Sequence, residues 1–213
     1  QLVSRGHEIA THGYHHELVF QMEPARFQED LSRSLDLIRQ VSGVQCRGYR
    51  APSFSIRRDM HWAWEILADQ GIEYDSSIFP VVHDRYGEPS APRSPFRVTI
   101  GGNLAIWEIP LSTVRMAGRN LPVAGGGYLR LFPYPFTRAA IRRINREGIP
   151  AIVYFHPWEI DPGQPCPDVT RFRLWRHRVG MTTFMQKLDR LLSDFEFGTM
   201  RQLVDGLKAG LKT

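Results

Sequence analysis

The sequence predicts an α/β fold in which βα units surround a parallel sheet or barrel. Short apolar segments alternate along the 213 residues with amphipathic stretches of helical length, and many of them end at a glycine. The polar residues that could bind a metal or take part in catalysis come directly after predicted strands. This placement is typical of (β/α) barrels, in which the chemistry is built at the carboxyl ends of the strands.

The individual elements follow from periodicity and from their end signals. Residues 1–5 form the end of a helix that Gly6 caps, and Pro24 opens a helix that Gly43 stops. The face that this helix turns toward the core is formed by Phe27, Leu31, Leu35, Ile38 and Val41. Further helices are expected at 58–70, 136–146, 182–195 and from about 199 to 207. Strands are expected at 7–11, 44–49, 72–74, 104–109 and 151–155.

Two irregular regions interrupt this pattern. Residues 75–103 are rich in Pro, Gly, Ser and Arg, and long loops of this kind in compact domains are usually functional. Gly125, Gly126 and Gly127 indicate a sharp turn or a close approach of two backbone segments. No internal repeat divides the chain, and one domain is the expectation at this length.

Composition excludes several classes of protein. The net charge is +5, without a block of like charges, so a nucleic-acid-binding tail is not expected. The mild basic excess fits either an anionic polymer as partner or an ordinary solvated surface. No apolar run approaches the roughly 20 residues that cross a bilayer. Cys46 and Cys166 are too far apart in sequence for a metal knuckle, and we interpret both as structural. The compartment stays open.

Four of the eight histidines lie within residues 7–16. His12 and His16 are spaced so that, on a helical turn, both imidazoles reach one metal ion, and His15 can replace either. Neutral imidazole suits zinc, cobalt or nickel, with a carboxylate as a frequent third ligand. The alternative is a histidine-rich turn at the surface.

Four more residues are candidates for a site, and three of them have a structural alternative. Arg50 follows a predicted strand and offers a fork for a carboxylate, or it forms a structural salt bridge. The backbone N–H of Ser53, after Pro52, can point at an oxyanion. His156 follows an apolar strand and can act as a general acid, or it is a capping or core histidine. Asp75 can support such a histidine, or it bonds its own backbone in a turn.

Together, these segments resemble the polysaccharide deacetylase family, also called carbohydrate esterase family four or the nodulation-protein-B homology domain. Thr11-His12-Gly13-Tyr14-His15-His16 resembles the family's histidine motif, Arg47-Gly48-Tyr49-Arg50-Ala51-Pro52 its arginine–proline motif and Phe155-His156-Pro157 its last motif. The segments Arg50 to Ser55, Tyr74 to Pro80, Gly125 to Tyr128 and His156 to Glu159 resemble a branch that is associated with exopolysaccharide and exosortase gene clusters.

The resemblance implies a metal-dependent carbohydrate N-deacetylase on a distorted, incomplete (β/α) barrel. It implies His12 and His16 as ligands of a divalent metal, most simply zinc, with cobalt or nickel as alternatives. Arg50 would orient the catalytic base, Ser53 would bind the oxyanion, His156 would be the general acid and Asp75 would support it. The substrate would be N-acetylhexosamine units of a bacterial polysaccharide. Tyr128 and Trp158 are candidate platforms for sugar rings, with core packing as the alternative.

The sequence departs from the family at one motif. The family carries a pair of aspartates on its first strand, and no Asp-Asp pair occurs in this chain. Because the sequence opens within a helix end, we expect this strand and its aspartates to precede Gln1. Without the pair, the resemblance implies neither a general base nor a third metal ligand here.

The resemblance also leaves the domain boundary and two other functions to be tested. It predicts a catalytic domain over residues 1–165 and a helical C-terminal extension over 166–213 that packs on the barrel. One alternative function is a related amidohydrolase for a small C–N substrate. The other is a non-catalytic carbohydrate-binding relative.

Overall fold

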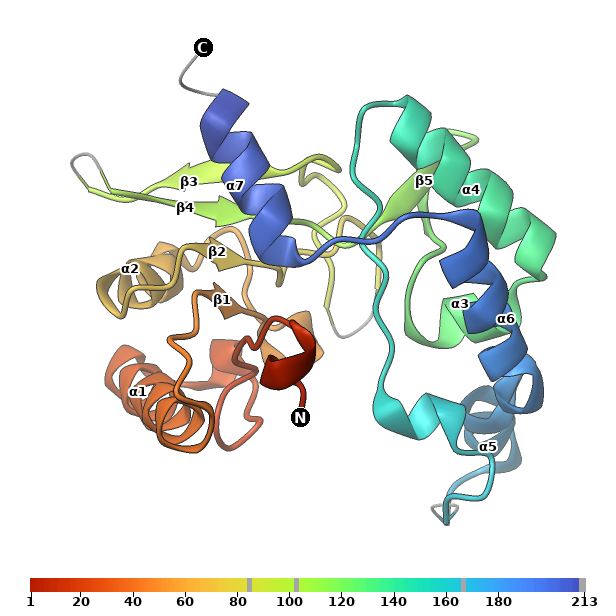
Figure 1. The fold of residues 1–213 in the computed structure, drawn as a ribbon, viewed down its shortest axis with the longest axis horizontal. Helices are drawn as coiled ribbons and strands as arrows, with labels where there is room; N and C mark the ends of the chain where they lie inside the picture. Colours follow the sequence, from red (N-terminus) through yellow and green to blue (C-terminus); the bar gives the residue numbers. More distant parts are fainter. Residues whose placement is uncertain (84–85, 102–103, 166–167, 211–213) are drawn as a thin grey trace. The chain divides into compact units, whose positions relative to one another are not determined.

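The structure is a computed structural model that describes residues 1–83, 86–101, 104–165 and 168–210. The chain divides into two compact units, one formed by Gln1–Pro110 with Gly198–Thr213 and the other by Leu111–Phe197. Each unit has its own hydrophobic cluster. Helices and a mixed sheet confirm the predicted α/β class (Figure 1). The predicted boundary at residue 165 falls inside the second unit and stays a prediction.

The first unit is built on a sheet of four strands in the order β1-β2-β4-β3. The strands β1, β2 and β4 are parallel, and β3 is antiparallel to β4. Their bounds are Gly48–Tyr49 for β1, Tyr74–Asp75 for β2, Phe96–Thr99 for β3 and Ala105–Glu108 for β4. The parallel strands lie where strands were predicted but are shorter, whereas β3 lies in a region that its composition marked as a loop.

Helices cover this sheet. The helix α1 (Pro24–Ser42) has Pro24 at its first turn and ends at Gly43, whose φ of 71° is left-handed, as predicted from the two residues. Phe27 and Leu31 of α1 are fully buried, whereas Val41 is 80% exposed, so the core-facing stripe ends earlier than predicted. The remaining helical segments of the unit are Val3–Arg5, Val19–Gln21, Pro52–Phe54, α2 (His61–Asp69) and α7 (Met200–Gly210).

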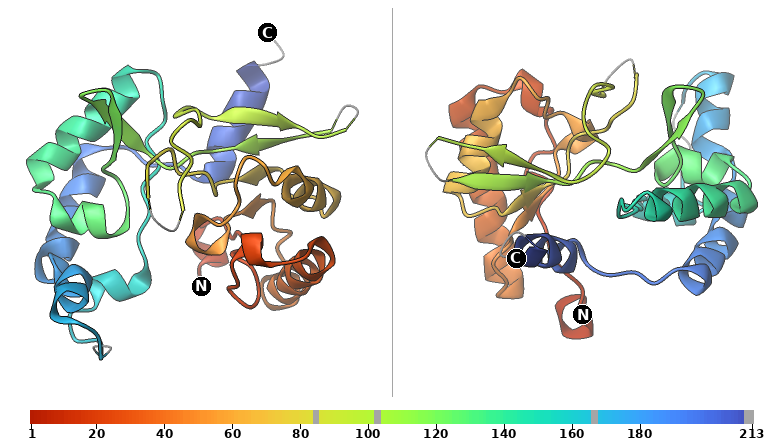
Figure 2. Two further views of the ribbon diagram at one scale, coloured as in Figure 1. Left: turned by 180° about the vertical axis from the view of Figure 1, so that it is seen from behind. Right: turned by 90° about the horizontal axis from the view of Figure 1, so that it is seen from above.

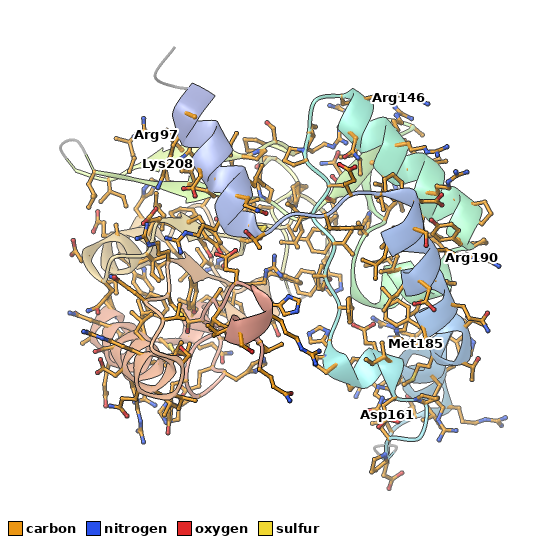
Figure 3. All side chains as sticks on the ribbon, viewed as in Figure 1. Arg97, Arg146, Asp161, Met185, Arg190 and Lys208 are labelled. Atoms are coloured by element: carbon orange, nitrogen blue, oxygen red, sulfur yellow. The ribbon has the colours of Figure 1, made fainter. Side chains whose placement is uncertain are left out.

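The last helix, α7, belongs to the first unit although it is distant in sequence. It crosses one face of the sheet, as Figures 1 and 2 show. Glu8 accepts a hydrogen bond from the backbone N–H of Arg201 at 2.9 Å, and Lys208, labelled in Figure 3, forms an ion pair with Glu73. Across the described ranges, no helix is both long and apolar enough to cross a bilayer.

The second unit packs helices on a two-stranded hairpin. The strands β5 (Thr113–Met116) and β6 (Arg119–Pro122) are antiparallel and are joined by Ala117 and Gly118, both with positive φ. Buried residues of α4 (Tyr134–Arg146) and α6 (Met181–Asp194) form the core with this hairpin. The other helical segments are α3 (Gly126–Leu131), Pro157–Ile160 and α5 (Arg171–Arg178).

The predicted strand at 151–155 is wrong, because only an isolated parallel bridge joins Tyr154 to Gly125. The close approach predicted at the glycine triplet is confirmed at this bridge. A Cβ atom added at Gly125 would lie 1.8 Å from the ring of Tyr154. The next residue, Gly126, has a φ of 49°, which L residues rarely adopt. The glycines therefore allow the segment that leads to His156 to pack closely against residues 125 and 126.

Candidate active site

The parallel strands of the first unit bring their final residues into one row. Thr11 forms a parallel bridge with Tyr49, Tyr49 pairs with Asp75, and Asp75 pairs with Glu108. Because these segments run in the same direction, the residues that follow them leave the sheet at one edge. Those residues are His12, Arg50, Ser76 and Ile109. The structure thus places His12 and Arg50 at one sheet edge, with Asp75 at the end of β2 in the same row, whereas His156 belongs to the second unit.

The two candidate metal ligands lie ring against ring. The ring centroids of His12 and His16 are 5.1 Å apart, with an angle of 75° between the rings. The expected helical turn is wrong, because Gly13 has a φ of 78° and His16 a φ of 58°, and the segment bends instead. The bend brings the imidazoles together without a helix, and both side chains are exposed.

A backbone carbonyl orients the ring of His12. The Nδ1 atom of His12 lies 2.6 Å from the carbonyl oxygen of Arg50. Because a carbonyl only accepts, Nδ1 donates, and Nε2 of the neutral ring carries the lone pair. Metal-binding histidines are typically held in this way through their second nitrogen. Two imidazoles on one tetrahedral ion have ring centres roughly 5 Å apart. The spacing of the pair agrees with two imidazoles on one ion, and metal binding by it stays a prediction.

The neighbouring His15, an alternative ligand from sequence, is bound to another residue. Its Nδ1 lies 2.8 Å from Oδ1 of Asp30, which also accepts the backbone N–H groups of Tyr14 and His15. Burial raises the pKa of Asp30, but these hydrogen bonds outweigh it and the pKa is lowered overall. Asp30 thus holds the bend that carries the histidines. Within the described residues, no group of three His, Cys, Asp or Glu side chains is placed to bind a metal.

Arg50 is fixed to the end of the neighbouring strand. Its Nε donates to the carbonyl oxygen of Ser76 at 2.9 Å, and one terminal nitrogen donates to Ser76 Oγ at 2.8 Å. Ser76 Oγ in turn donates to the carbonyl of Ile109 at 2.7 Å. The guanidinium is therefore held in one orientation at the sheet edge. Its expected action on a catalytic carboxylate stays a prediction.

The loop after Arg50 carries backbone strain. Ser53 and Phe54 have φ values of 51° and 53°, in the left-handed region. For residues with a Cβ atom this costs about 1–2 kcal/mol each. Such strain is concentrated at functional sites, where the surrounding structure maintains it. Ser53 is exposed at this position, and its role as an oxyanion donor stays a prediction.

Below the edge, two carboxyl groups are buried together. Asp75 and Glu108 are both 0% exposed. Asp75 accepts hydrogen bonds from Trp64 Nε1 at 3.1 Å and from Ser77 Oγ at 2.5 Å, and Glu108 accepts the N–H of Ile78 at 2.9 Å. Burial raises the pKa of Asp75 to about 6, and burial with the charge of Asp75 raises that of Glu108 well above its usual range. Burial of the two groups together therefore favours the protonated form of the pair.

In the second unit, His156 has a buried carboxylate as its partner. The His156 side chain is 52% exposed, and its Nδ1 lies 3.0 Å from Oε1 of Glu159, which also accepts the His156 backbone N–H at 2.9 Å. The other oxygen of Glu159 lies 2.7 Å from Nε of Arg130. Burial raises the pKa of Glu159, but the bonds from His156 and Arg130 lower it overall. The support of His156 by Asp75 stays a prediction, whereas the contact with Glu159 is present.

The candidate sugar platforms are half-buried. Trp158 stacks with both His156 and His177, with ring centroids at 5.8 and 4.8 Å. The guanidinium carbon of Arg130 lies 5.2 Å from the Trp158 ring centroid. Tyr128 stacks on Phe132 at 6.4 Å. These contacts support packing roles, and sugar binding by either ring stays a prediction.

The structure describes one of the two cysteines. Cys46 is a buried free cysteine whose Sγ donates to the carbonyl of Ile9 at 3.5 Å. This environment agrees with the structural role expected for it. Cys166 lies outside the described residues.

Comparison with known families decides where the chain belongs. Residues 76–205, more than half of the chain, match the family described as Domain of unknown function (DUF3473). The chain belongs to the DUF3473 family. Residues 1–74 match the family described as Polysaccharide deacetylase, which confirms the family expected from the motifs. The assignment of this DUF3473 protein to the branch associated with exopolysaccharide and exosortase gene clusters stays a prediction.

Individual relatives cover less of the chain. The DUF3473 protein is 32% identical over 77 residues to the peptidoglycan deacetylase of Helicobacter pylori and 35% identical over 77 residues to the peptidoglycan deacetylase-like protein FGM2 of Gibberella zeae. Each match covers 36% of this chain but only 25% and 22% of those relatives.

A solved structure extends the likeness to almost the whole chain. This structure, from Mycobacterium smegmatis and assigned to the polysaccharide deacetylases, superposes with a TM-score of 0.61 at 18% identity. The match covers 98% of this chain and 65% of that one. At this level of identity the likeness shows the fold, and it confirms the distorted α/β barrel class for the DUF3473 protein.

Several residues of the site were not indicated by the sequence. Glu108 has the position of an ordinary strand residue, and Asp30 that of an ordinary helix residue. Glu159 stands three residues after His156, at the spacing of a capping carboxylate, and this spacing is a signal that sequence inspection can use. No sequence signal joins Arg130 to Glu159, because the ion pair spans 29 positions.

Proposed function

We propose that the protein is a metal-dependent hydrolase that removes N-acetyl groups from N-acetylhexosamine units of a bacterial exopolysaccharide. The observation that carries the proposal is the His12–His16 pair, with Nδ1 of His12 held by the carbonyl of Arg50. The match of residues 1–74 to polysaccharide deacetylases supports the reaction class. The proposed substrate and the exosortase-associated branch rest on the resemblance of the sequence motifs to that family.

The pair would hold the metal through Nε2 of His12 and a ring nitrogen of His16. Imidazole nitrogens suit zinc, with cobalt or nickel as alternatives. When bound, such an ion polarises a carbonyl group and acidifies water. The third ligand and the general base that the resemblance implies are aspartates of a pair that is absent from this sequence.

The other residues would bind, orient and transfer protons. His156 would protonate the leaving amine from Nε2, because its Nδ1 is directed to Glu159. Glu159, held by Arg130, would keep the ring in this orientation and tautomer. The backbone N–H of Ser53 would donate to the oxyanion, and the fixed cation of Arg50 would orient the base. The products would be acetate and a free amino sugar.

Metal content and acetate release test this proposal together. The full-length gene product, loaded with zinc or cobalt, should release acetate from N-acetylhexosamine oligomers. His12→Ala and His16→Ala should each lose the metal and the activity. His15→Gln is the matched control, because His15 is bound to Asp30 and its variant should keep the metal.

Three outcomes decide between the possibilities. Unchanged metal content in both His12→Ala and His16→Ala would refute the ligand assignment. Glycan binding without acetate release by the metal-loaded protein would favour a non-catalytic relative. Hydrolysis of small cyclic amides alone would favour the amidohydrolase alternative.

A further inference from the structure

The helix α5 differs from the other long helices of the second unit because it has no buried residue. Phe172 and Trp175 on it are 66% and 54% exposed. Their ring centroids are 6.0 Å apart with 23° between the rings, so the two rings stack on each other at the surface. By contrast, α4 and α6 bury one face each in the core of the unit. An exposed ring pair of this size indicates an interaction surface.

Cationic side chains border this ring pair. The helix has the sequence RFRLWRHR, with four arginines and no acidic residue. At 100° per residue, Arg171 and Arg178 lie on one side of the aromatic stripe and Arg176 lies on the other. The surface therefore combines flat rings with planar guanidinium groups, which bind carboxylates through paired hydrogen bonds.

The helix is also connected to the candidate proton donor within the same unit. His177 of α5 stacks on Trp158 at 4.8 Å and 14°, and Trp158 stacks on His156. Arg130 donates to the carbonyls of His177 and Val179 at 2.8 Å each, which anchors the end of α5. These contacts fix α5 in the same unit as His156, whereas Phe172 and Trp175 lie on the side of the helix away from His177.

The distribution of residues on α5 favours a sugar polymer over a membrane. A helix that lies in a membrane interface separates an apolar face from a charged one. On α5 the apolar stripe is narrow and arginines border it on both sides, which leaves little apolar area for insertion between lipids. An acidic polysaccharide matches both features, because sugar rings have apolar CH faces and hexuronic acids carry carboxylates.

We propose that α5 is a binding surface for an anionic, hexuronate-containing polysaccharide, with sugar rings on Phe172 and Trp175 and carboxylates on the flanking arginines. The proposal rests on the proposed function and names the substrate class more narrowly. It assigns polysaccharide binding to this part of the DUF3473 segment.

Calorimetric binding of a hexuronic-acid oligomer tests the surface. The background is the full-length His16→Ala protein, which is expected to be inactive and has an unchanged α5. Phe172→Ala with Trp175→Ala should weaken binding about fivefold or more, because both stacking surfaces for sugar rings are lost. Arg171→Gln with Arg176→Gln should weaken binding and reduce its salt dependence.

A matched control removes the same charge from another helix of the unit. Arg142→Gln with Arg146→Gln changes two exposed arginines of α4, of which Figure 3 labels Arg146. This variant should bind the oligomer within about twofold of the parent. Dextran, which has sugar rings without carboxylates, should bind more weakly than the oligomer.

The outcomes separate this proposal from the proposed function. Equal binding by the ring variant and the α4 control would overturn the α5 surface, even if the active protein releases acetate. Binding that depends on α5 but without acetate release from the active protein would support the surface and refute the deacetylase. Preference of α5 for anionic lipid vesicles or single-stranded DNA over the oligomer would overturn it.

Discussion

In the first unit, His12 and Arg50 leave the sheet beside each other, because an isolated parallel bridge joins Thr11 to Tyr49 of β1, whereas in the second unit the bridge before His156 joins Tyr154 to Gly125, which lies in no strand. The first arrangement depends on backbone register, because Thr11 and Tyr49 pair in parallel. The second depends on side chains, because Glu159 and Arg130 orient His156. The order of residues along neighbouring strands can be predicted from strand patterns in the sequence. An ion pair between residues that are far apart in the sequence is found only in the tertiary structure.

The largest expected effect is the loss of this ion pair. The side chains of Arg130 and Glu159 are 3% and 1% exposed, so Arg130→Met leaves a buried carboxylate without its cation. The free energy of unfolding should fall by about 3–5 kcal/mol, as measured by urea denaturation. Arg130→Met with Glu159→Gln should lose less, because no charge is left buried. A loss below about 1 kcal/mol in the single variant would contradict the role of the pair.

Glu159→Gln should impair the reaction more than binding. The amide cannot hold His156 in the same tautomer, so kcat should fall by about 10–100-fold with KM nearly unchanged. The pH dependence of kcat should change as well, which a purely structural role would not cause. Steady-state acetate release across pH checks this. Equal losses in kcat and in folded protein would indicate a structural role alone.

Both units contain a glycine beneath a tyrosine ring, which allows a direct comparison. A Cβ added at Gly48 would lie 2.1 Å from Tyr74, and one added at Gly125 would lie 1.8 Å from Tyr154. Each Gly→Ala variant should lose about 1–3 kcal/mol in thermal or urea unfolding. The control is Gly206→Ala on α7, where an added Cβ meets no atom within 4 Å and stability should not fall. If Gly125→Ala alone left the free energy of unfolding unchanged, the segment at the isolated bridge could shift to make room for the added Cβ, whereas the sheet at Gly48 could not.

The buried carboxyl pair predicts a pH dependence in the first unit. Burial raises the pKa of Asp75 from 3.8 to about 6, so the folded state binds more protons than the unfolded state across this interval. The free energy of unfolding should therefore decrease as pH rises through this window. Glu108→Gln removes one member of the pair and should decrease less over the same range in urea unfolding. Identical pH slopes for the two proteins would refute the shared proton.

The smallest effect is expected in the strained loop at the sheet edge. Ser53 has a φ of 51°, which glycine adopts without a Cβ clash. Ser53→Gly should raise the free energy of unfolding by up to about 1 kcal/mol. Acetate release should stay near the parent rate, because the backbone N–H is retained. A large loss of activity would assign a role to the Ser53 hydroxyl group instead.

Elements with local signals were predicted from the sequence. The ends of α1 at Pro24 and Gly43 and the close approach at Gly125 agree with the structure. The strand at 151–155 was wrong, because an apolar run does not reveal whether a partner strand is available. The strand β3 was missed, because the surrounding Pro and Gly residues have the composition of a loop.

By itself, the sequence determined the α/β class, the family motifs and the nearness of His12 and Arg50 to strand ends. These features depend on residue type and on short-range spacing. Only the tertiary structure decided the bend that joins His12 to His16, the buried pair of Asp75 and Glu108, and the partner of Arg130. The physical reason is that such contacts join residues through strand order, burial and charge pairing, and these are set by the packed chain.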